Sequence, residues 1–201
     1  MAISYPLAFV GSDYIESVRF QSVNAVGISQ SPYTFQTQVY DFEAGAWTVD
    51  IDLRWLNRVE AAPVISFLDK LRGQYGTFTF GDVLTATPQG AASGTPLVKG
   101  GSQTGFSLDT DGWSISTLVL KAGDWIQIGT SLYRNLTDAT SSSGGEVTLD
   151  LWPHLKSHAD NAPITTANCK GLFRLNRSTQ VSQLIDRQKL YQITISADEA
   201  L

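Results

Sequence analysis

The residues of this chain that could carry chemistry are few. His154, His158 and Asp160 lie close together, and two histidines four residues apart on a helix can bind zinc. Pro153 precedes them, polar Lys156 lies between them, and the chain has no other histidine and only one cysteine. These neighbours favour a loop over a helix, so we predict a loop here and no metal site.

The stretch LRGQYGTFTFGD, residues 71–82, contains Gly73, Gly76 and Gly81 and resembles a glycine-rich phosphate loop. A phosphate loop leads from a strand into the N-terminus of a helix, where backbone N–H groups face the anion. Here a helical pattern precedes the glycines and a strand pattern follows them. The C-terminus of a helix carries partial negative charge, which repels phosphate. The stretch therefore predicts a helix end and a turn.

The chain has five tryptophans, which raises the possibility of carbohydrate stacking: Trp47, Trp55, Trp113, Trp125 and Trp152. Trp47 and Trp55 share the apolar parity of one alternating run, so we predict that both lie in the core. Trp113 lies beside turn residues and is the best candidate for an exposed ring. With its acidic neighbours Asp109 and Asp111, it is a candidate glycan contact, and a carbohydrate-binding, receptor-binding module is the alternative function.

No catalytic pattern emerges from the remaining polar residues. Asp50 and Asp52 are two residues apart, which on a strand places both on one solvated face, whereas a glycosidase brings two carboxylates from distant positions into a cleft. Cys169 has no histidine near it in the sequence, and no G-x-S-x-G motif occurs. We predict no enzyme activity, no cofactor and no catalytic, cofactor-binding or metal-binding residues.

Composition limits the partners of the chain. Charged residues make up only 16% of its 201 residues, which hints that much of its surface meets other protein. The net charge of −5 argues against sequence-specific nucleic-acid binding. No apolar run is long enough for a membrane span, and the N-terminus has no basic, apolar signal pattern. We therefore expect no membrane insertion, and synthesis and assembly in the cytoplasm.

The patterns predict a mainly β chain with one helix. Residues 32–42 and 43–56 alternate apolar and polar side chains, and the turn at Glu43–Gly45 predicts an antiparallel hairpin between them. Between residues 59 and 72 the apolar period becomes helical, with Asn57 and Glu60 as a capping pair and Gly73 just past the end.

A change in composition divides the chain. Residues 83–160 are rich in Gly, Ser and Thr, and turn signals separate short strands, which predicts an inserted small β-barrel, OB-like or SH3-like. Strand patterns return after residue 160. We expect residues 1–82 and 161–201 to form one β-sandwich that carries the helix.

Two blocks together resemble known phage proteins. Residues 53–82 couple a strand, an amphipathic helix and an aromatic-rich strand. Residues 120–155 are similar to a small barrel element of tail proteins from double-stranded DNA bacteriophages. The residues that match this element are Gly123, Asp124, Ile126, Ile128, Gly129, Tyr133, Gly144, Gly145, Leu149, Trp152, Pro153 and Leu155. The chain thus resembles the distal tail proteins of long non-contractile-tailed phages, or a prophage relative.

This resemblance implies a tail-tube-like β-sandwich with one helix and an inserted barrel. It also implies a structural virion protein of the tail, six copies of which form a ring at the end of the tail tube. The expected partners are other copies of the chain, the tail tube protein, the tape-measure protein and a tail-tip hub or fibre protein, around a channel for DNA. An extended loop at residues 21–31 is a candidate for reaching a neighbouring subunit.

Overall fold

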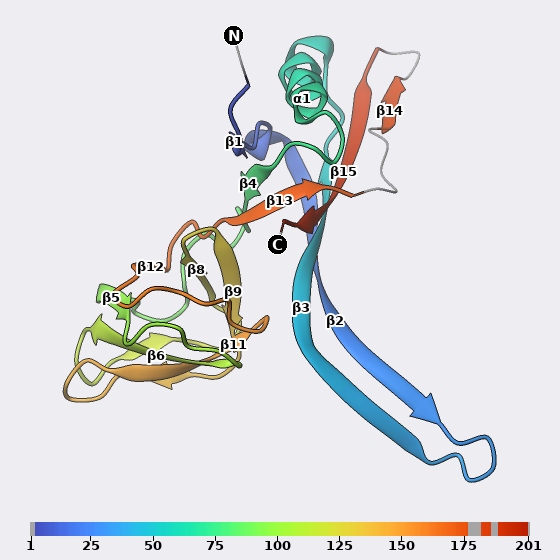
Figure 1. Ribbon diagram of the computed structural model, residues 1–201. Helices are drawn as coiled ribbons and strands as arrows, with labels where there is room; N and C mark the ends of the chain where they lie inside the picture. The colour runs from blue at the N-terminus through green and yellow to red at the C-terminus, as the bar shows by residue number, and fades with distance from the viewer. Residues whose placement is uncertain (1–2, 177–181, 186–188, 201) are drawn as a thin grey trace.

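The computed structural model describes residues 3–176, 182–185 and 189–200 (Figure 1). In these residues the chain is mainly β with a single α-helix and a nearly closed, barrel-like sheet, as the sequence patterns predict. A short 3-10 helix at Ser12–Tyr14 precedes the first long strand. Figure 1 shows a body carrying α1, a barrel to one side, and a long hairpin that projects away from both.

The sheet of the body is built only from segments before residue 81 and after residue 170. Its strands, in spatial order, are β1 (Leu7–Ala8), β4 (Phe78–Phe80), β13 (Gly171–Leu175), β15 (Tyr191–Glu199), β3 (Thr37–Leu53) and β2 (Ile15–Gln30), and β14 (Ser182–Ile185) also pairs with β15. Only the β1–β4 pair is parallel. The two ends of the chain therefore meet in one sheet.

The barrel holds the segment between them. Its strands, in order, are β12 (Ile164–Thr165), β8 (Trp125–Ile128), β9 (Ser131–Asn135), β11 (Val147–Trp152), β6 (Ser107–Trp113) and β5 (Gly94–Val98), with a separate pair of β7 (Leu118–Leu120) and β10 (Ala139–Thr140). A bridge between Leu97 and Pro163 joins the two edges. Because β12 belongs to this sheet, the barrel continues past residue 160.

The helix α1 spans Arg58–Leu71, within one residue of the predicted range. Asn57 accepts hydrogen bonds from the backbone N–H groups of Val59 and Glu60, and the Glu60 carboxylate accepts one from the Asn57 N–H, so the predicted capping box is present. The buried stripe of the helix packs on the sheet and consists of Ala61, Val64, Phe67, Leu68 and Leu71.

The alternation predicted for the second run is confirmed along the body half of β3. Trp47, Val49, Ile51 and Leu53 are buried, while Thr48, Asp50 and Asp52 lie on the other face. Trp55 was predicted to share the buried face, but it is 43% exposed, so this prediction is wrong. The strand ends at Leu53, and beyond that residue the strand parity no longer applies.

The position of the hairpin turn is also corrected. The two predicted runs form one continuous strand, β3, which pairs with β2, and the turn lies at residues 31–36 instead of at Glu43–Gly45. Glu43, with φ of 52°, lies at an irregularity in the pairing, where Asn24 faces Gly45 and Val26 faces Asp41. Such a bulge redirects a strand without ending it, so the turn signal marks a bend.

Residues 71–82 join the helix, the sheet and the barrel as predicted. Arg72 and Gly73 adopt positive φ after the helix, and the Gly76 N–H donates to the Leu71 carbonyl. Phe78 and Phe80 are buried in the sheet. Gly81 lies directly against the backbone of Cys169, where a Cβ atom would overlap the Cys169 carbonyl oxygen.

Gly81→Ala is therefore expected to destabilise the protein by about 3 kcal/mol or more, because the β4–β13 pair must separate to admit a methyl group. Chemical denaturation of the purified variant measures this change. Gly144→Ala is the matched control, because a Cβ there meets only the Ser142 hydroxyl at 3.6 Å. Equal stability of the two variants would contradict the close approach at Gly81.

Candidate functional site

The structure overturns the predicted exposure of Trp113. Its side chain is 4% exposed, packs in the barrel core and donates from Nε1 to the Thr110 hydroxyl at 2.8 Å. Gly112, with φ of 77°, allows β6 to continue through the predicted turn and directs Trp113 inward. A buried ring cannot stack on a sugar, so the glycan contact proposed for this residue is wrong.

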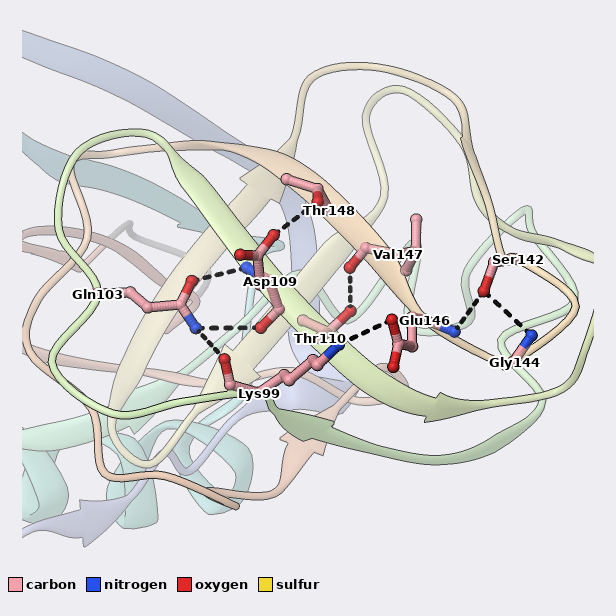
Figure 2. Close-up of polar contacts among 9 residues, drawn as sticks. All are labelled: Lys99, Gln103, Asp109, Thr110, Ser142, Gly144, Glu146, Val147 and Thr148. Atoms are coloured by element: carbon pink, nitrogen blue, oxygen red, sulfur yellow. Dashed lines mark hydrogen bonds and ion pairs between the residues drawn. The ribbon is translucent and has the colours of Figure 1, made fainter.

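Asp109 and Asp111 lie on the outer face of β6, away from Trp113. Asp109 borders a shallow polar hollow of about 580 Å³ on the barrel. Its carboxylate accepts from the Thr148 hydroxyl at 2.6 Å, and Lys99 forms an ion pair with Glu146 at 2.7 Å (Figure 2). The bond to Glu146 and the charges of Glu146, Asp111 and Asp109 raise the pKa of Lys99. The described residues lining the hollow include no aromatic ring on which a sugar could stack.

The two histidines lie in a loop, as predicted, and contact different partners. His154 accepts from the Gly105 N–H at 3.2 Å and lies 3.5 Å from the Glu43 carboxylate. His158 pairs with the Tyr133 hydroxyl at 2.9 Å. Within residues 3–176, 182–185 and 189–200, no three His, Cys, Asp or Glu side chains gather as a metal site would require.

The one cysteine is a packing residue. Cys169 lies in the main core, and burial raises the pKa of its thiol to about 12. A thiol with this pKa stays protonated at neutral pH and reacts slowly.

A further surface is the part of the β2–β3 hairpin that leaves the body. β15 pairs with β3 from Thr48 to Asp52, so residues 22–46 form a two-stranded ribbon with no third strand among the residues that the structure describes; we call this segment the arm. Figure 1 shows it projecting from the body, and β2 forms the free edge of the sheet.

The arm exposes apolar side chains on both faces and at its tip. Its exposed large apolar residues are Val23, Val26, Ile28, Tyr33, Phe35, Val39, Tyr40 and Phe42. Val39 faces Ile28 across the strands on one side, while the rings of Tyr40 and Phe42 pack at 4.8 Å on the other. Isolated two-stranded ribbons are marginally stable in water, and large exposed apolar patches commonly mark interaction sites. The arm is thus the strongest candidate functional surface.

The barrel supports the arm where the strand bends. The Trp152 Nε1–H donates to the Asn24 side chain at 2.8 Å, and Gly45 lies against Trp152 and Pro153. The barrel thereby fixes the direction in which the arm leaves the body.

A buried joint holds the barrel on the sheet. The Glu199 carboxylate, almost fully buried, accepts from the Trp47 N–H at 3.1 Å and from Lys156 Nζ at 2.9 Å. Arg134 of the barrel lies 4.1 Å from the ring centre of Trp125 and 4.8 Å from that of Trp47. Charge and aromatic stacking together make the sheet and the barrel one packed unit.

From the sequence, residues 21–31 were predicted to form a loop that reaches a neighbouring subunit. Residues 32–42 were predicted to form a half-buried strand. The available signal was that Val39, Tyr40 and Phe42 place apolar side chains on both parities. In a strand this pattern indicates either burial on both faces or a ribbon that awaits a partner.

The sequence has no match among protein-family models, and no curated protein matches it significantly. In the part of the chain that the structure describes, no helix has the length and apolar character needed to cross a membrane.

Glu199→Ala is expected to destabilise the protein by about 2–3 kcal/mol, because it leaves the Trp47 N–H and the Lys156 ammonium without their partner at the joint. Urea denaturation followed by tryptophan fluorescence measures this loss. Glu146→Ala, which breaks the exposed ion pair with Lys99, is the control and should change stability far less. Comparable losses of stability in both variants would show that the buried joint contributes no more than an exposed ion pair.

His158 is expected to make stability depend on pH. Burial, and secondarily the charge of Lys156, lower its pKa below the ordinary value of 6.5. The unfolded chain therefore binds a proton more readily than the folded chain. The contribution of neutral His158 to folding stability is complete above about pH 6.5 and is lost as the pH falls through the folded pKa. Melting temperatures between about pH 8 and pH 5 should fall less steeply for His158→Gln than for the unmodified protein. Identical slopes would contradict this assignment, and His154→Gln controls for general histidine loss.

Proposed function

We propose that this protein is a structural virion protein that forms a ring at the distal end of a phage tail tube. The ring would connect the tube to the tail-tip hub or fibre and leave a channel for DNA. The observation that carries the proposal is the arm, a ribbon with apolar residues on both faces and no core beneath it. The sequence resemblance of residues 50–156 to distal tail proteins supports the same assignment.

An arm on every subunit requires a receiving surface on another subunit. If the arm of one copy contacts a different surface on the next, the contact is heterologous, and repetition around an axis closes a ring. Two unlike contact surfaces per subunit also fit the low charge content of the chain, since protein rather than water would cover much of its exterior.

The outer face of the body sheet has the polarity expected of a channel lining. Asp50 accepts from the hydroxyl of Ser196, Asp52 from that of Thr194, and Asp198 from that of Thr48. Arg19 and Arg174 pair in register with Asp50 and Asp198, so cations alternate with carboxylates there. A surface without a continuous basic stripe does not retain passing DNA.

A structural role also fits the polar groups. Among the described residues, the histidines, the thiol and the polar hollow each have separate structural partners and do not converge on one cleft. With Trp113 buried, the carbohydrate-binding alternative has lost its aromatic platform.

The purified protein is expected to form rings, visible by negative-stain electron microscopy, with a matching mass by light scattering. Replacement of residues 25–44 by an Asn-Gly turn keeps the Asn24–Gly45 pair and should give a folded monomer. Circular dichroism and thermal unfolding confirm that the shortened chain is folded. Rings from the shortened chain, or a full-length chain that stays monomeric at high concentration, would overturn the proposal.

A further inference from the structure

We propose that the tip of the arm docks into the hollow beside helix α1 of a second copy of this chain. This inference rests on the proposed function, because it names the receiving surface that ring formation requires. It assigns the two unlike surfaces of the heterologous contact: the arm on one subunit and the outer face of α1 on the next.

The hollow beside α1 is lined by both apolar and charged side chains. It measures about 580 Å³, and its apolar lining includes Ala62, Ile65 and Tyr191. Its charged lining consists of the cations of Arg58, Lys70 and Arg72 and one carboxylate, Asp69. The lining therefore has an excess of positive charge, in a protein whose net charge is −5.

The arm has the opposite charge. No lysine or arginine occurs between Arg19 and Arg54, and residues 22–46 carry the two carboxylates of Asp41 and Glu43. Complementary charge at an interface guides the approach of the partners and disfavours wrong pairings. The carboxylates lie toward the base of the arm and its tip is uncharged, so the docked tip brings no like charge to the cations that line the hollow.

The apolar surfaces also correspond. Tyr33 and Phe35 at the tip are 92% and 73% exposed, and aromatic side chains commonly anchor interfaces by filling pockets. The hollow offers the apolar side chains of Ala62 and Ile65 and the ring of Tyr191. Aromatic residues from the tip would cover these side chains.

The position of the two surfaces selects a second copy as the occupant. Figure 1 shows the tip of the arm and α1 at opposite ends of the molecule. The barrel fixes the base of the arm through Trp152 and Pro153, so the arm cannot fold back onto its own helix. A surface at one end and its complement at the other lead to head-to-tail contacts between copies.

Crosslinking between two single-cysteine variants tests this contact. Thr34→Cys places a thiol at the tip without removing either aromatic anchor, and Ser66→Cys places one in the hollow. A tag on one variant distinguishes the mixed product by mass. The native Cys169 does not interfere, because burial raises the pKa of its thiol to about 12. With a short bismaleimide, the mixed pair should crosslink about tenfold more than Thr34→Cys mixed with Ile115→Cys, an exposed position on the barrel.

The outcomes separate this inference from the proposed function. Rings that form without the Thr34→Cys to Ser66→Cys product would overturn the docking site and leave ring formation intact. A dominant product between two Thr34→Cys chains would show tip-to-tip contact and would also overturn it. Absence of any assembly by the unmodified full-length chain would instead refute the proposed function itself.

Discussion

The structure depends on one strand that belongs to two environments. Along Trp47–Leu53, β3 pairs with β15 and buries alternate side chains under α1; along Thr37–Ala46 it pairs only with β2 and buries none. The pairing of β2 with β3 crosses this boundary as far as Asn24 and Gly45 and resumes beyond the bulge, so the core holds the base of a ribbon that has no core of its own. The apolar side chains on that ribbon stay exposed to solvent in the fold of a single chain.

The barrel gives this strand its direction. Glu199 and Lys156 hold the barrel on the sheet. Trp152 and Pro153 pack against Gly45, next to the bulge that redirects the strand. Chain segments that are far apart in sequence thus meet at the base of the arm. A barrel that holds a hairpin in one orientation suits an assembly subunit, in which the relative position of two contact surfaces decides whether a ring closes.

Local patterns predicted the elements well where one face is buried and one is solvated. Alternation identified the body half of β3, and the apolar period with the Asn57–Glu60 capping box identified α1. The same rules failed where a local signal was ambiguous. The turn signal at Glu43–Gly45 marks a bulge, and Gly112 allows a strand to continue and turns Trp113 into the barrel. A glycine or an acidic turn residue permits a change of direction, and only the pairing partner decides whether the strand ends.

The sequence by itself determined the mainly β class, the single helix with its cap and the β-rich character of the middle segment, because these follow from the spacing of side chains along the chain. It also contained the apolar residues of the arm, on both parities of the strand. Only the tertiary structure decided that these residues lie outside the core, because burial depends on whether a third strand or a helix covers the hairpin. That cover comes from β15 and ends at Thr48, and the pairing of β15 with β3 joins segments about 150 residues apart.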